Sequence, residues 1–450
     1  MRNGEISLAQ AAQCCGGTVA AEYAEKTFRG ANFDTRRLQR GELFVAITGA
    51  RDGHDFAADA LQKGAAAVLA SKPLAAEIPA IYVRDTVAAL QAIAAGYRRT
   101  LPLKSVGITG SVGKTTTKEM IAAVLETTYR TEKTAANFNN GLGLPVTVLG
   151  LQPDCEAAVL EMGMNHFGEL SVLTRIAQPD IAVITNIGTM HIENLGSREG
   201  ILRAKLELLE GLRPGGTVFF NGDDDLLRTV RETYHAKCFG VSPDCDVRAE
   251  DIRMSEDGIR FTAAAGELRF PVELPVVGRH NVLNALAAIA VGLELHVPVA
   301  GIQAGLAGFH NTGMRQKIYP LRGMTVIEDC YNAGPESMRA ALQVLKDTKT
   351  AGRHIAVLGG MLELGDHAPL AHYEVGKAAA QCADLLFAYG AHAEEYVRGA
   401  EEAGIPAQLY PTHEALTEAL CRTAKPGDVL LVKGSRGMRM ERVLELLGND

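Results

Sequence analysis

The sequence lacks an excess of positive charge, and this absence limits the kinds of partner the protein can bind. Its 45 lysine and arginine residues are outnumbered by 53 aspartates and glutamates, which gives a formal net charge of −8 at pH 7. A general nucleic-acid or anionic-membrane surface needs a basic field, so neither is expected. Anionic substrates must instead be bound by local groups.

The sequence also lacks long hydrophobic runs and paired cysteine motifs. No apolar run approaches the roughly 20 residues of a membrane span, and the start, MRNGEISLAQAAQ, lacks the charged and apolar regions of a signal peptide. We therefore expect a soluble, cytoplasmic protein without membrane insertion. The cysteines show no CxxC or zinc-like spacing, which indicates free thiols in a reducing compartment, at positions 14, 15, 155, 238, 245, 330, 382 and 421.

The chain of 450 residues has room for about three domains. Strand-like apolar runs alternate with helix-period segments, a pattern typical of parallel sheets covered on both faces, so the predicted class is α/β. We expect a small N-terminal domain over 1–85, a central nucleotide-binding domain over 86–315 and a Rossmann-like domain over 316–450. The expected strands are 43–47, 66–69, 81–83, 105–109, 157–160, 181–185, 217–220, 324–328, 355–358, 385–389 and 429–432, with a helix over 199–212.

The stretch TGSVGKTTTKEM, residues 109 to 120, has the residue types of a phosphate-binding loop between a strand and a helix. Glycines 110 and 113 leave backbone N–H groups free to converge on anionic oxygens, Lys114 supplies a point charge, and Thr115 offers a hydroxyl to magnesium. The loop is shorter than the usual GxxxxGK[ST], because Ile108 stands five positions before Gly113. ATP or GTP is the expected ligand, bound by Thr109, Gly110, Ser111, Val112, Gly113, Lys114 and Thr115.

Polar residues follow several of the expected strands. In open parallel sheets ligands bind beyond the carboxyl ends of the strands, so Glu161, His191, Asp329 and Lys433 are candidates for one shared cleft. Helix capping or a solvated loop position is the alternative for each of them. A carboxylate beside triphosphate suits magnesium, whereas imidazole is a less common ligand for that ion.

Lys205 interrupts an apolar stripe in the expected helix 199–212. It shares the face of Ile201, Leu202, Leu208 and Leu209 by the spacing of three and four residues. Burial favours a neutral amine, which can react with carbon dioxide to give an anionic carbamate. The alternative is a stem on apolar surface with the ammonium in water, and the pattern does not decide between them.

Several motifs together resemble the Mur ligases of bacterial cell-wall synthesis over nearly the whole chain. Besides the phosphate loop these are NFNNGLGLP at 137–145, EMG at 161–163, GRHNVLNALAA at 278–288 and VKGSRGM at 432–438. DTRRLQRGELFVAITGARDGHDF at 34–56 is similar to the uridine-nucleotide domain of later family members. EDCYNAGPESM at 328–338 and GGMLELGDH at 359–367 are similar to the member that adds D-alanyl-D-alanine to a UDP-N-acetylmuramoyl-tripeptide, and no DNPR-like motif of the diaminopimelate-adding member occurs.

The resemblance implies roles for individual residues. Thr115 and Glu161 would hold one Mg²⁺, and His191 with carbamylated Lys205 would hold a second. Asn281 and Asn284 would face adenine, with helix capping as the alternative; Asp329 would face the ribose, and Arg315 the phosphates. The residues expected near the UDP-tripeptide or the dipeptide are Thr35, Arg36, Asn137, Asn140, Asn332, Lys433, Ser435 and Arg436.

The resemblance also implies a reaction. ATP would phosphorylate a carboxylate, and an amine would capture the acyl phosphate, with Lys114, His191, Lys205 and Arg315 as the catalytic residues. We expect a monomer that acts on UDP-N-acetylmuramoyl-tripeptide and D-alanyl-D-alanine. The alternatives are another Mur-type ligase such as the third-residue-adding enzyme, a folylpolyglutamate-like synthase, a P-loop kinase or a nucleotide switch.

Overall fold

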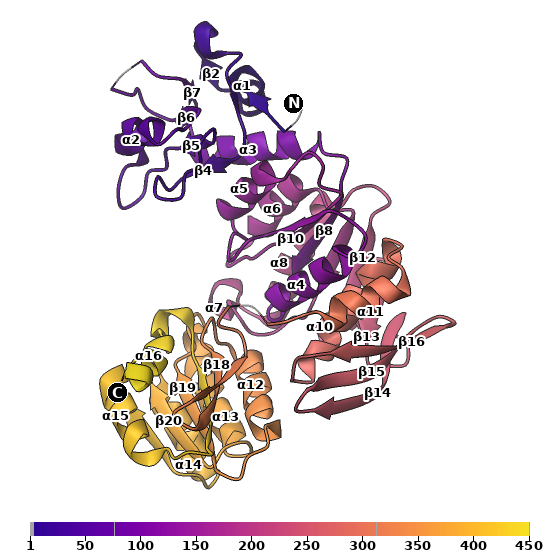
Figure 1. Ribbon diagram of the computed structural model, residues 1–450, viewed down its shortest axis with the longest axis vertical. Helices are drawn as coiled ribbons and strands as arrows, with labels where there is room; N and C mark the ends of the chain where they lie inside the picture. The colour runs from indigo at the N-terminus through magenta and orange to yellow at the C-terminus, as the bar shows by residue number, and fades with distance from the viewer. Residues whose placement is uncertain (1–3, 76, 312, 450) are drawn as a thin grey trace.

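The computed structural model describes residues 4–75, 77–311 and 313–449, which form three α/β units in chain order (Figure 1). Each unit is built around its own sheet, with strands that lie within residues 18–82, 104–274 and 317–433. A separate antiparallel pair joins β1 (Ile6–Ser7) to β3 (Thr27–Phe28). The α/β class expected from the sequence is confirmed, and each sheet falls within one of the predicted domains.

The first unit has a five-stranded sheet in the order β2-β7-β6-β5-β4, parallel except for the edge strand β2. A capping box begins its first helix, because Ser7 and Gln10 exchange backbone-to-side-chain hydrogen bonds of 3.2 Å. The elements are β2 (Thr18–Val19), β4 (Ala31–Asn32), β5 (Leu43–Val45), β6 (Ala67–Ala70), β7 (Ala80–Tyr82), α1 (Leu8–Cys15), α2 (Ala57–Gln62), η1 (Ala21–Tyr23) and η2 (Gly53–Phe56).

Helix α3 (Thr86–Arg98) connects the first unit to the second. The Asp85 side chain caps its N-terminus, and the helix packs against α1 of the first unit and against α5 and α6 of the second. Tyr97 donates a hydrogen bond of 2.8 Å to the carbonyl of Leu151, and the buried Arg98 donates one of 2.9 Å to that of Ala177. These bonds anchor α3 on the central unit.

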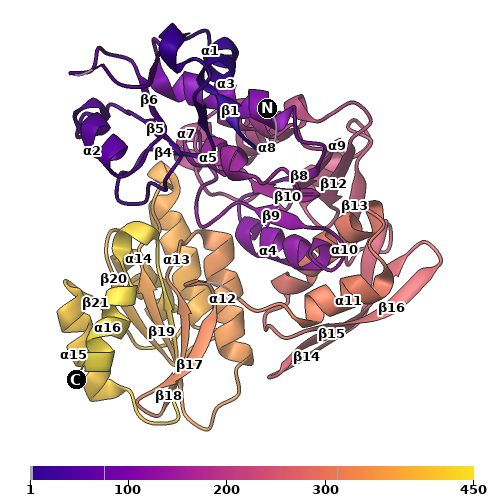
Figure 2. The same cartoon turned by 45° about the horizontal axis from the view of Figure 1, so that its top comes forward.

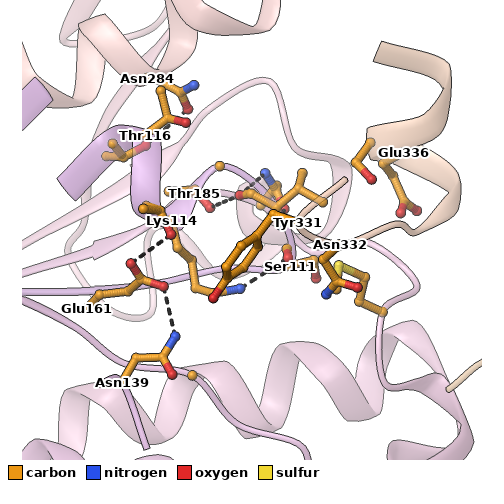
Figure 3. A pocket seen from close by; sticks show the side chains of 18 of the residues that line it. Ser111, Lys114, Thr116, Asn139, Glu161, Thr185, Asn284, Tyr331, Asn332 and Glu336 are labelled. Atoms are coloured by element: carbon orange, nitrogen blue, oxygen red, sulfur yellow. Dashed lines mark hydrogen bonds between the residues drawn. The ribbon is translucent and has the colours of Figure 1, made fainter. Parts of the chain in front are cut away.

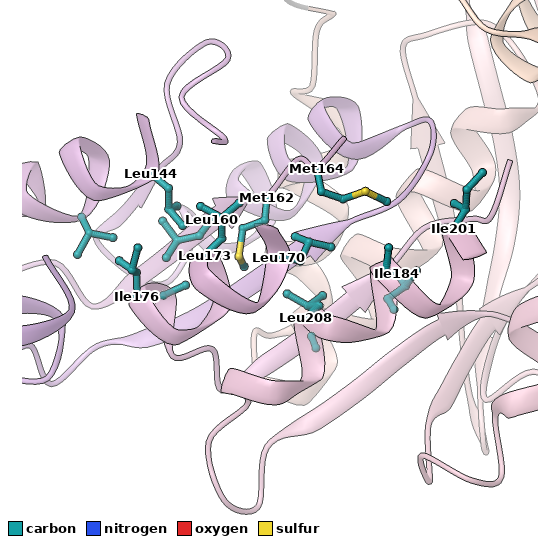
Figure 4. Close-up of a cluster of buried hydrophobic side chains, with 14 of the residues drawn as sticks. Leu144, Leu160, Met162, Met164, Leu170, Leu173, Ile176, Ile184, Ile201 and Leu208 are labelled. Atoms are coloured by element: carbon teal, nitrogen blue, oxygen red, sulfur yellow. The ribbon is translucent and has the colours of Figure 1, made fainter. Parts of the chain in front are cut away.

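The central unit has a nine-stranded sheet in the order β16-β15-β14-β13-β12-β11-β8-β10-β9. Its inner strands are buried on both faces, so neighbouring residues enter different cores: Val159 packs on one side and Leu160 on the other. Figure 4 shows the second of these cores, in which Leu160 and Ile184 meet side chains of the covering helices such as Leu170, Leu173 and Ile201. The strands are β8 (Lys104–Thr109), β9 (Thr131–Lys133), β10 (Ala157–Glu161), β11 (Ile181–Ile184), β12 (Thr217–Asn221), β13 (Lys237–Gly240), β14 (Val247–Ser255), β15 (Gly258–Ala265) and β16 (Leu268–Leu274).

The expectation of parallel sheets covered on both faces is wrong at one edge of this unit. Strands β14, β15 and β16 pair antiparallel, and β16 alternates between exposed and buried residues. Such a half-exposed strand has no long apolar run, which is why the sequence pattern did not reveal it.

The helices of the central unit include the one that the sequence predicted around Lys205. The helix expected over 199–212 is α-helical only to residue 206 and continues as the 3-10 helix η3 (Glu207–Gly211). The helices are α4 (Lys114–Leu125), α5 (Gly143–Gly150), α6 (Glu169–Ala177), α7 (Ile192–Leu195), α8 (Arg198–Leu206), α9 (Asp225–Val230), α10 (His280–Glu294) and α11 (Val299–Ala307).

The C-terminal unit has a six-stranded sheet in the order β17-β18-β22-β19-β20-β21, parallel except for β17. It lies beside the central unit (Figure 2). The strands are β17 (Lys317–Leu321), β18 (Met324–Asp329), β19 (His354–Gly359), β20 (Leu385–Tyr389), β21 (Ala407–Tyr410) and β22 (Val429–Lys433). The helices are α12 (Pro335–Asp347), α13 (Ala368–Ala379), α14 (Ala393–Glu402), α15 (His413–Thr423), α16 (Glu441–Asn449), η4 (Gly365–His367) and η5 (Arg436–Met438).

A helix that crosses a lipid bilayer needs about 20 predominantly apolar residues. Within the described ranges, no helix is long and apolar enough to cross it.

Candidate active site

A cavity of about 700 Å³ lies between the central and C-terminal units, in the size range of small-molecule sites. Side chains from the ends of β8, β10, β11, β18 and β22 meet there, as expected for the carboxyl edges of parallel sheets. The predicted residues that line it are Ser111, Val112, Gly113, Lys114, Thr115, Asn140, Glu161, His191, Asn284, Arg315, Asp329, Asn332 and Lys433.

The phosphate loop runs between β8 and α4 and is held against the end of β11. Gly110 has a φ of 154°, and a Cβ placed there would lie 1.8 Å from Thr185 Oγ1, so no side chain fits. The carbonyl of Val112 accepts hydrogen bonds from Thr185 Oγ1 at 2.7 Å and from Asn186 Nδ2 at 3.0 Å, while the Val112 N–H donates to Asn186 Oδ1 at 2.9 Å. The strand end therefore sets the shape of the loop.

Lys114 is folded back over this loop. Its Nζ donates to the carbonyl oxygens of Gly110 at 2.7 Å and Ser111 at 3.2 Å. Burial lowers the pKa of Lys114, the nearby Arg315 lowers it further, and Glu161 opposes both. A bound anion would stabilise the ammonium form, which suits Lys114 to a phosphate oxygen. Thr109, at the end of β8, has a buried hydroxyl without a hydrogen-bond partner in the described part of the chain.

Glu161 ends β10 and lies directly against the loop (Figure 3). Its Oε2 accepts from Thr115 Oγ1 at 2.9 Å, and its Oε1 accepts from Asn139 Nδ2 at 2.9 Å. Arg315 Nη2 donates to Thr115 Oγ1 at 3.0 Å, and its guanidinium stacks 4.1 Å from the Tyr331 ring centroid. A hydroxyl and a carboxylate side by side are the oxygen ligands that Mg²⁺ prefers, so this pair fits the predicted ion.

A buried lysine outside the cavity lining, Lys118, lies close to the Glu161 carboxylate. Lys118 Nζ lies 3.9 Å from Glu161 Oε2 and 3.0 Å from Glu119 Oε1, and it donates to the carbonyl of Thr134 at 2.7 Å. The side chain of Lys118 is only 1% exposed, so its charge is compensated almost entirely by these groups.

Lys205 is 2% exposed, and the interpretation that its ammonium reaches water is therefore wrong. Burial lowers the pKa of Lys205 well below its usual range, and the Lys114 charge lowers it further. Burial thus disfavours the ammonium form, which suits carbamate formation, although Lys205 does not belong to the cavity lining. No cluster of three or more His, Cys, Asp or Glu side chains that could hold a metal occurs among the described residues.

His191 adopts a left-handed backbone conformation with φ of 65° immediately before α7. Its Nδ1 lies 2.5 Å from Glu363 Oε2 of the C-terminal unit, but the two groups are not aligned as a hydrogen bond. The contact is therefore an ion pair when the imidazole is protonated. Pairing with His191 lowers the pKa of Glu363.

The two asparagines of α10 occupy different depths. Asn284 lines the cavity and accepts a hydrogen bond from Thr117 Oγ1 at 3.0 Å. Asn281 lies outside the lining, donates to the carbonyl of Val277 at 2.7 Å and accepts from Asn284 Nδ2 at 3.0 Å. Asn281 thus orients Asn284, and neither side chain caps the helix.

The C-terminal unit contributes an ion pair, Lys433 with Asp329, to the cavity lining. Lys433, at the end of β22, donates to Asp329 Oδ2 at 2.7 Å and to the carbonyl of Asn332 at 2.9 Å. Ser435 is buried outside the lining and connects the carbonyl of Ala333 with the loop after β19. Arg436 also lies outside it and pairs with Glu441 at 2.8 Å.

Of the residues predicted at the UDP-tripeptide, Thr35, Arg36 and Asn137 lie outside the cavity lining, whereas Asn140 belongs to it. Arg36 is exposed and pairs with Asp34 at 2.7 Å, and the ion pair lowers the pKa of Asp34 to about 2. Thr35 interacts with Asp59, and Asn137 is exposed. Asn140 reaches the cavity, but its Oδ1 accepts from two backbone N–H groups at the start of α5.

Several lining residues were missed in the sequence. Asn139 and Tyr331 stand inside motifs that had already been singled out, next to Asn140 and Asn332, and only their contacts show their importance. His280 and Glu336 also stand inside quoted motifs, at 278–288 and 328–338, without having been chosen as site residues, whereas Gln91 of α3 lies outside every quoted motif.

Comparison with known proteins assigns every unit of the chain. Residues 27–98 match the catalytic domain model of the Mur ligase family, residues 108–292 the Mur ligase middle domain, and residues 314–436 the glutamate ligase domain. The chain belongs to the Mur ligase family. It is therefore an enzyme of the ligase class.

Among Mur ligases, the chain is similar over its full length to one specific group. It is 42% identical to the UDP-N-acetylmuramoyl-tripeptide–D-alanyl-D-alanine ligase of Bacillus subtilis, over 95% of both chains, and 35% identical to that of Escherichia coli, over 98% of both. The solved MurF of Acinetobacter baumannii superposes with a TM-score of 0.92 at 32% identity and 99% coverage of both chains. The MurF ligase of Thermotoga maritima, solved in complex with ADP, has a TM-score of 0.83 at 30% identity, covering 94% of this chain and 97% of that one.

Proposed function

We propose that this Mur ligase joins D-alanyl-D-alanine to UDP-N-acetylmuramoyl-tripeptide with ATP, through an acyl phosphate. The observation that carries the proposal is the cavity in which the phosphate loop and Glu161 face Asp329 and Lys433 of the C-terminal unit. Full-length relatives named for this reaction, and one solved with ADP, support the same assignment.

ATP would occupy the cavity with its phosphates at the loop of residues 109–115. The N–H groups of the loop and Lys114 would bind the phosphate oxygens. Asn284 would face adenine with Asn281 behind it, and Asp329 would reach the ribose. Arg315, already at the Thr115 hydroxyl, would bind a phosphate from the side of the C-terminal unit.

Thr115 and Glu161 would hold a Mg²⁺ ion, and His191 with a carbamylated Lys205 would hold a second. The adjacent oxygens of the first pair and the buried amine of Lys205, whose pKa is lowered mainly by that burial, fit these roles. When bound, the ions supply positive charge that neutralises the transferred phosphoryl group.

The chain's own groups account for the remaining steps by positioning and exclusion of water. Lys114 and Arg315 would hold the γ-phosphoryl group in line with the peptide carboxylate, where little covalent help from the protein is needed. The dipeptide amine would then attack the activated carbonyl, the same cations would stabilise the oxyanion, and the amide would form as the bond to phosphate breaks, the amine loses a proton and inorganic phosphate leaves. The C-terminal unit would protect the acyl phosphate from hydrolysis by covering it.

We assign UDP binding to the N-terminal domain over 1–85, ATP binding to 86–315 and closure to the Rossmann-like domain over 316–450. Thr35 and Arg36 would contact the uridine diphosphate, while Asn137 and Asn140 would lie toward the sugar or peptide. Asn332, Ser435 and Arg436 would lie near the incoming dipeptide. The monomer would act in the cytoplasm, where ATP and the nucleotide precursor meet.

One reconstitution tests the proposal. Purified protein is incubated with ATP, Mg²⁺, D-alanyl-D-alanine and either the lysine or the diaminopimelate UDP-tripeptide, and products are read by mass together with released phosphate. A UDP-pentapeptide with one ADP and one phosphate per bond is expected. A phosphorylated substrate without phosphate release would instead indicate a kinase, and joining of a single amino acid would indicate another ligase of the family.

A further inference from the structure

The loop of residues 185–191 touches the phosphate loop on one side and the C-terminal unit on the other. On the first side, the N–H of Gly188 donates to Ser111 Oγ at 2.8 Å. On the second, Glu336 Oε1 accepts from both the N–H and the hydroxyl of Thr189, each at 3.1 Å. Only one peptide unit therefore separates the contact to the phosphate loop from the contact to α12.

The glutamate lies directly on the loop backbone. A Cβ built at Gly188 would lie 2.8 Å from the carboxyl carbon of Glu336 and 2.9 and 3.1 Å from its oxygens. A second close approach lies beside it, because a Cβ at Gly334 would meet Met190 Cγ at 2.8 Å. At both points the missing side chain of a glycine lets the opposing side chain, Glu336 or Met190, pack directly against the backbone.

The charges around the contact favour a carboxylate at position 336. Glu336 stands in the first turn of α12, where the helix dipole stabilises negative charge. Arg198 holds the carbonyl of Ile187 in the same loop at 2.8 Å. Hydrogen bonding to Asp225 is the main cause that raises the pKa of Arg198, and Glu336 adds to it.

The contact also determines where the residues before α12 lie. Asp329, Tyr331 and Asn332 connect β18 to α12 and line the cavity, and Tyr331 stacks on Arg315. Fixing the start of α12 on the loop therefore fixes these side chains opposite Lys114. In Figure 3 Glu336 lies at the start of its helix, with Asn332 and Tyr331 between it and Lys114.

We propose that Glu336 is a positioning residue that docks the C-terminal unit onto the phosphate loop through Gly188 and Thr189. Through this contact, the position of the C-terminal unit over the cavity is linked to the conformation of the phosphate loop, residues 109–115. This inference rests on the proposed ligase reaction, and it adds a residue that the reaction does not by itself require.

The first test is Glu336→Ala. Loss of both Thr189 hydrogen bonds to the half-buried carboxylate is expected to lower kcat for pentapeptide formation about tenfold. The KM for ATP changes less, because the loop residues that bind phosphate remain. Scattering with Mg²⁺ and a non-hydrolysable ATP analogue is expected to show a larger radius of gyration than for the wild type.

Two further variants separate docking from folding. Gly188→Ala keeps the glutamate but displaces its carboxylate, so it is expected to reproduce the loss in kcat, and the double variant Gly188→Ala with Glu336→Ala should be no worse than either single one. Glu336→Gln keeps Oε1 as an acceptor and should retain activity within about threefold of the wild type. Glu445→Ala, an exposed carboxylate in α16, serves as the control and should leave kcat unchanged.

The outcomes distinguish the inference from the proposed function. If the wild type forms no pentapeptide, the proposed function fails. If the wild type is active but Glu336→Ala keeps its kcat and scattering profile, only the docking role is overturned. Multiplicative losses in the double variant, with unchanged melting temperatures, would also overturn it, because the two positions would then act independently.

Discussion

Replacing Glu161 by glutamine tests whether this carboxylate binds magnesium or only supports the fold. The substitution keeps the shape of the side chain and one oxygen that can accept from Asn139, but the amide nitrogen that would face Thr115 can only donate, and the negative charge is removed. If Glu161 is a ligand, the half-saturating Mg²⁺ concentration is expected to rise at least about tenfold, since even residues behind a metal ligand cost 10 to 100 times in affinity.

The structural cost of the same change follows from Lys118. At 3.9 Å and an effective dielectric constant of about 20, the attraction between Lys118 and Glu161 is about 4 kcal/mol before desolvation is counted. Lys118 keeps Glu119 and the carbonyl of Thr134, so the free energy of unfolding is expected to fall by about 1 to 2 kcal/mol, less than for a buried charge left alone.

Glu119→Gln is the matched control. Glu119 also contacts Lys118, at 3.0 Å, but it lies outside the cavity lining. Both variants should lose similar stability in chemical denaturation, while only Glu161→Gln shifts the magnesium titration of ATP-dependent phosphate release. An unchanged titration in Glu161→Gln, with the stability loss of the control, would refute the ligand role.

Three other changes have defined outcomes. Lys114→Ala should abolish phosphate release from ATP, because the loop loses its point charge, and substantial turnover would remove the loop from the mechanism. Lys205→Ala should be inactive but partly restored by acetate, which can supply the missing carboxylate, whereas wild-type activity would exclude a carbamate. His372 is fully buried, its Nε2 accepts from the N–H of Met361 at 2.9 Å, and burial lowers its pKa from 6.5 to about 4. The unfolded chain thus binds more protons between these values, and stability should fall by up to about 3 kcal/mol as pH drops from 6.5 to 4. Denaturation curves of His372→Gln should lack this component, and an identical slope would contradict it.

Much of the fold was predictable because parallel strands that are buried on both faces appear in the sequence as continuous apolar runs. The expected strand 385–389 has the bounds found for β20, and the strand expected over 105–109 differs from β8 by one residue. The antiparallel strands β14 to β16 escaped prediction, since partial exposure removes the apolar run on which the prediction depends.

The candidate site was predictable in part for the same reason. Lys114 and Thr115 follow β8 after a short loop, Glu161 ends β10, and the parallel pairing of these two strands brings their ends together. Asn139, His280 and Glu336 stand on a loop or on helices, and nothing local in the sequence marks which of these residues face the cavity.

The sequence alone determined the class of the fold, the phosphate loop and the family, because these depend on local spacing of glycine, lysine and apolar residues. The burial of Lys205, the pairing of Glu161 with Thr115 and Asn139, and the contact of Glu336 with Gly188 were decided only by the tertiary structure. Each of these depends on groups distant in the chain, whose burial and separation arise only when the sheets and domains pack.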